Sequence, residues 1–247
     1  MTRNIKLLIE YEGTNYVGWQ KQPESHGKSI QGLLEDSLRT MVQHEVHLTA
    51  AGRTDAGVHA QGQVANFFTP SAIPAERFPP GLKGLLPADI VVKGAWEVPE
   101  QFHARYSALR KTYRYTIRTA RAPSAFEWRY SLHLPIPLNV EAMKTGAGFF
   151  LGTHDFTSFC AKGSPAKKFI RTVHACRISS DQEHIYFEVT ADGFLYNMVR
   201  IMVGTLVNVG RGRWAPEHVK TIIEAKNRNL AGPTAEPQGL MLCEVNY

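Results

Sequence analysis

Near its start the chain alternates between polar and apolar residues, with Leu8 as the exception. Over residues 4–11 one side of the alternation holds only apolar or aromatic side chains, Ile5, Leu7, Ile9 and Tyr11. A period of two predicts a half-buried β-strand. After Ser29, a favourable N-cap, apolar residues recur at helical spacing and predict a helix that starts at Ile30. The pattern then predicts strands at 46–51, 63–68 and 90–96 and a short helix at 80–86.

The second half repeats this β-α-β-β-α-β order loosely. Strands are expected at 112–119, 172–178, 184–190 and 240–246, and helices at 140–151, 196–209 and 217–225. Two such units predict an α+β protein with two ferredoxin-like (RRM-like) halves, residues 1–105 and 106–247, and a cleft between them.

Composition and charge narrow the function. With 43% hydrophobic and 20% charged residues, the 247-residue chain is typical of a soluble globular protein. Its longest apolar stretch, 198–209, is too short to span a bilayer, and three widely spaced cysteines fit the cytoplasm better than a disulfide framework. The net charge is +6, and residues 101–126, 156–180 and 193–216 hold six, five and three Lys or Arg without any acid. Such tracts are typical of a nucleic-acid surface, although solvated faces would look the same.

The densest group of polar residues is the loop GRTDAGVHA at 52–60. Gly52 and Gly57 can adopt backbone angles closed to other residues and allow a ligand to approach. Asp55 between them is a candidate nucleophile, because a carboxylate is ionised at neutral pH and can attack an electrophilic carbon. Arg53 lies two residues away. The alternative is that Thr54 and Asp55 only cap a turn.

Arg200 lies in a predicted helix that is apolar nearly all round. A buried guanidinium requires an anionic partner or an opening onto a cleft, since an unpaired buried charge costs several kcal/mol. Asp55 is one candidate partner, and a structural ion pair with another acid such as Asp192 is the alternative.

Tyr113 and Tyr115 alternate with Arg114 along a predicted basic strand. Aromatic side chains on such a strand can stack on an unpaired RNA base. Tyrosines of this kind are also common as core residues of a sheet.

Together the motifs resemble the bacterial tRNA pseudouridine synthase A family. The matching segments, in family order, are YEGTNYVGWQ (11–20), AGRTDAGVHA (51–60), FHAR (102–105), KTYRY (111–115), GTHDFTSF (152–159), GFLYNMVR (193–200) and GLML (239–242). They extend over essentially the whole chain, and the second is the most specific. Departures are small, such as Glu12 where the family often has Asp.

The resemblance implies the pseudouridine synthase fold with a positively charged central cleft. It implies that Asp55 is the catalytic nucleophile, that Arg200 pairs with it, that Tyr113 stacks on the target uracil and that Arg53 keeps the nucleotide out of the helical stack. The substrate would be uridine 38, 39 or 40 in the anticodon arm of tRNA, bound by a homodimer with no metal or organic cofactor. Both addition of Asp55 to the base and addition to the ribose fit the sequence, and the acceptor of the C5 proton is open.

Two other functions fit parts of the sequence. The basic tracts and aromatic strands alone would suit an RNA-binding protein without activity. The pattern G-x-G-x-x-A at 210–215 would suit a dinucleotide-binding oxidoreductase, but it follows a helix-like run and not a strand.

Overall fold

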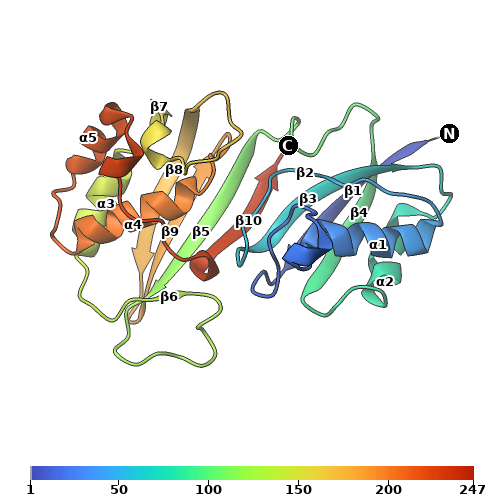
Figure 1. Cartoon of the computed structure of the whole chain (residues 1–247), viewed down its shortest axis with the longest axis horizontal. Helices are drawn as coiled ribbons and strands as arrows, with labels where there is room; N and C mark the ends of the chain where they lie inside the picture. The colour runs from blue at the N-terminus through green and yellow to red at the C-terminus, as the bar shows by residue number, and fades with distance from the viewer. Residues whose placement is uncertain (1) are drawn as a thin grey trace. The chain divides into compact units, whose positions relative to one another are not determined.

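The computed structural model describes residues 2–247 and divides the chain into two compact units. Met1–Leu109 and Met241–Tyr247 form the first unit, and Arg110–Leu240 forms the second. Each unit is an α+β structure with its own set of paired strands (Figure 1).

The first unit follows the predicted β-α-β-β-α-β order. Its elements are β1 (Arg3–Tyr11), α1 (Ile30–Val42), β2 (Thr49–Ala50), β3 (His59–Thr69), α2 (Phe78–Lys83), β4 (Ile90–Val98) and β10 (Leu240–Asn246). Strand β1 pairs antiparallel with both β3 and β4, and β2 pairs antiparallel with the other edge of β3. This is the strand order 4-1-3-2 of a ferredoxin-like unit. Strand β10 adds a short parallel pairing to β3, through Met241 and Leu242.

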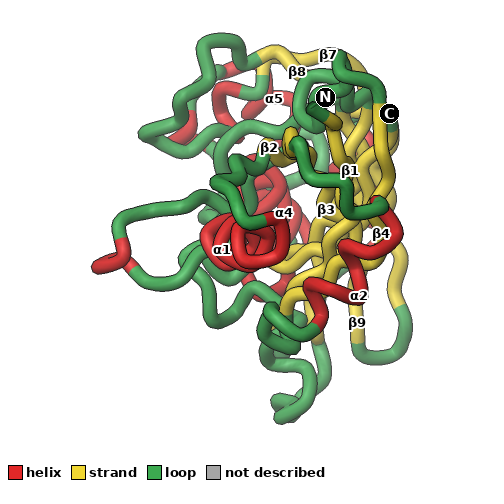
Figure 2. The backbone as a smooth tube through the Cα atoms, turned by 90° about the vertical axis from the view of Figure 1, so that its right-hand side faces the viewer, coloured by secondary structure: helices red, strands yellow, loops and turns green. Residues whose placement is uncertain are grey.

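One face of this sheet packs against the helices. Ile5, Leu7 and Ile9 of β1 are fully buried, and Figure 2 shows α1 alongside one face of the strands. Burial of each such side chain contributes about 1.5–3 kcal/mol. The first turn of α1 is capped as expected, because the Ser29 hydroxyl accepts a hydrogen bond from the main-chain N–H of Gly32 at 3.2 Å.

The second unit holds a four-stranded antiparallel sheet in the order β5-β9-β8-β7, with β6 parallel to β5. Its elements are β5 (Arg110–Arg118), β6 (Leu132–His133), α3 (Val140–Gly148), β7 (Gly152–Asp155), β8 (Ile170–Ser180), β9 (His184–Ala191), α4 (Met198–Gly210) and α5 (His218–Ala225). Helix α3 contacts β8, α4 and α5, and these helices gather together in Figure 1. Only Arg200 and Val207 of the 13 residues of α4 are not fully buried, as its apolar composition predicts.

Three element predictions need correction. The strand expected at 46–51 is reduced to Thr49–Ala50, and the strand expected at 63–68 already begins at His59. The helix expected at 80–86 lies earlier, at Phe78–Lys83, after a 3-10 turn. Prolines at helix positions N2 and N3 fit this earlier start, because the first turn needs no N–H from them. In the described part of the chain no helix has the length and apolar character to cross a membrane.

Candidate functional site

The Asp55 loop, residues 51–58, connects β2 to β3 in the first unit. A turn at its end is closed by a 3.1 Å hydrogen bond from the Val58 N–H to the main-chain oxygen of Asp55. Gly57 in this turn has a φ of +76°, a backbone angle that favours glycine, as expected. Gly52 is not among the described glycines with positive φ, so that part of the expectation is wrong. The closing bond uses the main-chain oxygen of Asp55 and not its carboxylate.

A second loop, residues 12–20, supports the Asp55 loop through backbone contact. A Cβ atom on Gly13 would lie 2.0 Å from the carbonyl oxygen of Val58, and one on Gly18 would lie 2.7 Å from that of Thr54. The Trp19 N–H donates a 3.0 Å hydrogen bond to the same Thr54 oxygen. Two segments that the sequence marked as separate motifs therefore form one structural element.

Buried polar side chains hold the start of the Asp55 loop. The Tyr11 hydroxyl lies 2.7 Å from Thr54 Oγ1, and the Gln63 amide donates to the Gly52 carbonyl at 2.8 Å and to the Tyr11 hydroxyl at 3.3 Å. Tyr11, Thr54 and Gln63 are all nearly or fully buried. No local sequence pattern reveals this group.

His59 ties the end of the loop to Gly13. Its Nδ1 accepts a 3.0 Å hydrogen bond from the Gly13 N–H and lies 3.4 Å from a carboxylate oxygen of Glu12. His59 therefore connects the end of the Asp55 loop to the start of loop 12–20.

The two predicted residues of this loop differ in exposure. Asp55 is half-buried, whereas Arg53 is exposed. Hydrogen bonds fix the backbone on both sides of Asp55 and so fix the position of its Cα atom. The Arg53 side chain is exposed to solvent.

Tyr113 lies in the second unit, on the face of β5 that is buried. It is 7% exposed, and its ring meets Phe194 edge-on with centroids 5.0 Å apart. Tyr115 lies on the same face and donates a hydrogen bond to the Glu236 carbonyl oxygen at 2.7 Å. Burial raises the pKa of Tyr115 far above its usual range, so this tyrosine is a structural hydrogen-bond donor.

Arg200 lies in the first turn of α4 in the same unit, half-buried. Its Nε donates to the Ala235 carbonyl oxygen at 2.7 Å, and one terminal nitrogen donates to Asn197 Oδ1 at 3.0 Å. The segment that supplies Ala235 lies directly on the helix, because a Cβ on Gly204 would be 1.8 Å from the Pro233 carbonyl oxygen. The close packing of this segment on α4 therefore fixes the carbonyl group to which the guanidinium donates. Asp192, the alternative partner, accepts a hydrogen bond from the Thr172 N–H at 3.1 Å.

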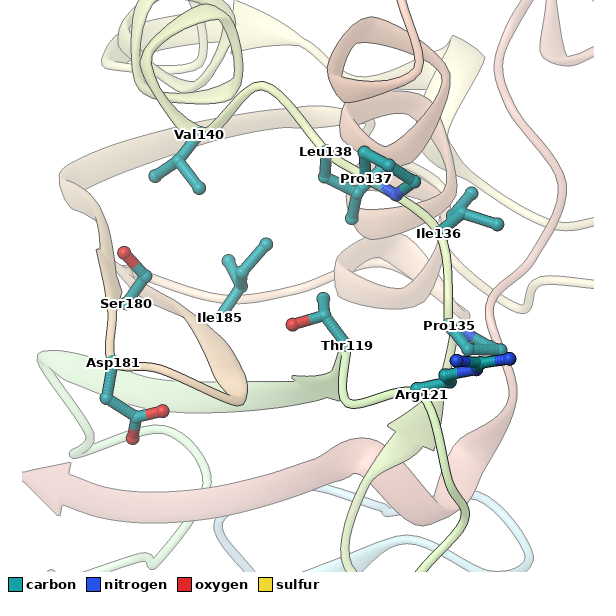
Figure 3. Close-up of a pocket in the computed structure, with 10 residues that line it drawn as sticks. All are labelled: Thr119, Arg121, Pro135, Ile136, Pro137, Leu138, Val140, Ser180, Asp181 and Ile185. Atoms are coloured by element: carbon teal, nitrogen blue, oxygen red, sulfur yellow. The ribbon is translucent and has the colours of Figure 1, made fainter.

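A cavity of about 340 Å³ in the second unit is lined from segments 119–121, 135–140 and 180–185 (Figure 3). None of Arg53, Asp55, Tyr113 and Arg200 lines it. Its one carboxylate, Asp181, accepts hydrogen bonds from the N–H groups of Glu183 and His184 at 2.9 and 2.7 Å. These bonds make Asp181 a turn residue, and we assign no chemistry to this cavity.

A family model described as tRNA pseudouridine synthase matches residues 7–107 and 147–247. The chain belongs to this family. Arg53, Asp55 and Arg200 fall within the matched ranges, and Tyr113 falls between them.

Full-length relatives agree with this assignment. A tRNA pseudouridine synthase A of Moorella thermoacetica is 52% identical over 98% of this chain and 99% of its own length. Proteins of the same description from Acetivibrio thermocellus and Caldicellulosiruptor saccharolyticus are 47% and 46% identical over 99% of this chain and 100% of their own lengths.

Family membership makes the chain an isomerase and confirms the pseudouridine synthase fold predicted from the motifs. The oxidoreductase alternative fails on structure as well. Gly210 is the last residue of α4, whereas a dinucleotide-binding glycine would follow a strand and open a helix.

Proposed function

We propose that the chain converts uridine to pseudouridine at positions 38, 39 and 40 in the anticodon stem-loop of tRNA, with Asp55 as the nucleophile. The observation that carries the proposal is the full-length match to the synthase A relatives, together with an Asp55 loop fixed on both sides. The named relatives act on tRNA by their descriptions, and the three acid-free basic tracts suit a polyanionic substrate.

The reaction needs a nucleophile without prior activation, which a carboxylate provides. Asp55 adds either to the uracil ring or to the ribose, and the N1–C1′ bond breaks. The uracil then turns, the C5–C1′ bond forms and the bond to Asp55 breaks, which frees the carboxylate. C5 loses its proton and N1 gains one. Substrate and product have the same atoms, so the reaction consumes no oxidant, reductant or cofactor.

A uridine in a stem must leave the helical stack before the carboxylate can reach it, at a cost of a few kcal/mol. We assign Arg53, whose side chain is exposed beside Asp55, to holding the nucleotide out of the stack. We assign Tyr113 to stacking on the extruded uracil, a role typical of aromatic side chains that hold single RNA bases.

We assign Arg200 to pairing with Asp55 during the reaction. The structure supports this role through the anchoring of Arg200, since Ala235 and Asn197 both fix its guanidinium. A charge-assisted pair would keep the carboxylate ionised and aimed.

The proposed partners are the anticodon arm of tRNA and a second copy of the chain in the cytoplasm. The homodimer follows from the family resemblance. Light scattering of the purified protein tests it, and a mass of one chain at micromolar concentration would contradict it.

The decisive experiment uses tRNA transcribed with tritium at C5 of uridine and no added metal or cofactor. Pseudouridine formation expels this tritium into water, and we expect release by the wild type but none by Asp55→Asn. Both proteins should bind tRNA with similar affinity, because the substitution keeps the size of the side chain. The product is mapped by nucleoside mass spectrometry of the anticodon arm.

Two outcomes would contradict the proposal. Tight binding with no tritium release from several tRNAs would favour an RNA-binding protein without this activity. Near-normal release by Asp55→Asn would keep the reaction and remove Asp55 from it.

A further inference from the structure

We propose that Tyr11, Thr54 and Gln63 form a buried hydrogen-bond chain that positions the Asp55 loop for the chemical step. The inference rests on the proposed role of Asp55 and adds three positioning residues to it. None of the three is a catalytic residue in this proposal, because they act through the backbone that carries Asp55.

The hydrogen-bond chain is buried and continuous. Tyr11, Thr54 and Gln63 are 2%, 6% and 0% exposed, respectively. Their polar atoms connect at 2.7 Å between Tyr11 and Thr54 and at 3.3 Å between Gln63 and Tyr11. Buried polar groups are stable only when they are hydrogen-bonded, so a satisfied group of this kind specifies one arrangement of its members.

The Gln63 amide group donates two hydrogen bonds within this hydrogen-bond chain. An amide nitrogen only donates, and the two N–H groups of Gln63 are directed at the Gly52 carbonyl and the Tyr11 hydroxyl. The Tyr11 oxygen accepts from Gln63, and either hydroxyl of the Tyr11–Thr54 pair can donate its proton to the other. Burial raises the pKa of Tyr11 to about 12, so the phenol keeps its proton at neutral pH.

The hydrogen-bond chain contacts the Asp55 loop at two points, one on each side of Arg53. One is the Gly52 carbonyl, which accepts from Gln63, and the other is the Thr54 hydroxyl, one residue before Asp55. The Gln63 side-chain oxygen is also bonded, since it accepts from the Val64 N–H at 3.2 Å. A displacement of about 1 Å in a reacting group costs on the order of 100-fold in rate, so a loop fixed in this way affects kcat.

The first test replaces Thr54 in two ways. Thr54→Val keeps the shape and removes the hydroxyl, whereas Thr54→Ser keeps the hydroxyl and removes a methyl group. We expect Thr54→Val to lower kcat for tritium release about tenfold or more, with KM for tRNA within about twofold, and Thr54→Ser to restore most of the wild-type kcat. A packing role would give the reverse order, with Val active and Ser impaired.

The second test uses Tyr11→Phe with a matched control. Tyr247 lies in the same unit outside both loops, and its hydroxyl donates to the Ala104 carbonyl oxygen at 2.8 Å. We expect Tyr11→Phe to lower kcat as Thr54→Val does. Tyr247→Phe should retain the wild-type kcat even where its free energy of unfolding falls by a similar amount.

The outcomes separate this inference from the proposed function. Wild-type kcat in both Thr54→Val and Tyr11→Phe, with Asp55→Asn inactive, would overturn the positioning chain and leave the nucleophile in place. An equal loss of kcat in Tyr247→Phe and Tyr11→Phe would also overturn it, because the effect would then be general destabilisation. Activity of Asp55→Asn would instead remove the premise, whatever the other variants show.

Discussion

At the scale of single residues, the site depends on how closely backbones approach one another. Gly18 has a φ of +104°, and a side chain there would meet the main chain of Thr54, Asp55 and Ala56. Two separate costs would fall on any other residue at this position, namely backbone strain and overlap with the loop that carries Asp55.

We therefore predict that Gly18→Ala lowers the free energy of unfolding by about 2 kcal/mol and also impairs tritium release. Gly84→Ala is the matched control, because Gly84 has a φ of −84° and nothing within 4 Å of the position of an added Cβ. We expect Gly84→Ala to be neutral or slightly stabilising. Urea unfolding of both variants checks the difference, and equal stabilities would refute the close-approach argument.

Residue type reveals some members of the site and hides others. Asp55 and Arg200 stand out because a carboxylate between glycines and a cation in an apolar helix are both unusual. Gln63 does not stand out, since a glutamine in a strand is ordinarily exposed. Its partner Tyr11 lies 52 residues away in sequence, and no local pattern connects the two.

At the scale of elements, periodicity predicts long strands and helices well and their ends poorly. Strand β1 and helix α4 form where their patterns predict them. Strand β3 begins earlier than predicted, because His59 and Ala60 pair with β10, which is distant in sequence. Strand β2 is short because only Thr49 and Ala50 continue the pairing with β3. Tertiary pairing decides both boundaries, and a local pattern cannot contain it.

The turn between β8 and β9 provides a prediction about pH. The Glu183 N–H, followed by the Tyr186 hydroxyl and the His184 N–H, lowers the pKa of Asp181 from 3.8 to about 2. A carboxylate with a depressed folded-state pKa stabilises the protein fully above its unfolded value of 3.8, and this contribution is lost as the pH falls towards about 2. We expect Asp181→Ala to lower the urea midpoint at pH 6 and to differ less from wild type at pH 3.

The control for this variant is Glu100→Ala, which removes an exposed carboxylate from another turn. Its difference from wild type should be small at both pH values. If the urea midpoints of Asp181→Ala and the wild type differ by the same amount at pH 6 and pH 3, the hydrogen bonding of the carboxylate is contradicted.

At the scale of the whole molecule, the first unit is discontinuous in sequence. A division at 105/106, as predicted from the sequence, places the last strand with the second half, whereas β10 pairs with β3 and groups with residues 1–109. The contact is close, because a Cβ on Gly62 would lie 2.3 Å from the Cys243 carbonyl oxygen. The Tyr247 hydroxyl also donates to the Ala104 carbonyl oxygen at 2.8 Å.

Leu242 tests this connection, since its side chain is fully buried. We expect Leu242→Ala to lower the free energy of unfolding by about 2–4 kcal/mol and to reduce hydrogen-exchange protection along β3. Met241→Ala, at the half-buried neighbour, should have a smaller effect. Unchanged protection of β3 in Leu242→Ala would show that the last strand does not stabilise the first unit.

The distribution of positive charge over the molecule predicts how the affinity for tRNA depends on salt. If the basic tracts contact phosphates, the affinity for tRNA falls with salt, and each lost contact lowers the slope of log K against log salt by about 1. Lys167 and Lys168 are exposed in an acid-free tract, whereas Lys144 and Lys220 are exposed lysines paired with Glu141 and Glu224. Replacing either lysine pair with glutamine changes the net charge from +6 to +4.

We expect the 167/168 double variant to bind tRNA more weakly and to lower the salt slope by about 2, and the 144/220 double variant to keep the wild-type slope. Fluorescence titrations between 50 and 200 mM salt measure both slopes. Equal slopes in the two variants would mean that net charge alone draws tRNA to the protein. A loss confined to the first variant would place phosphate contacts on this tract, because the two proteins carry the same charge and differ only in where it lies.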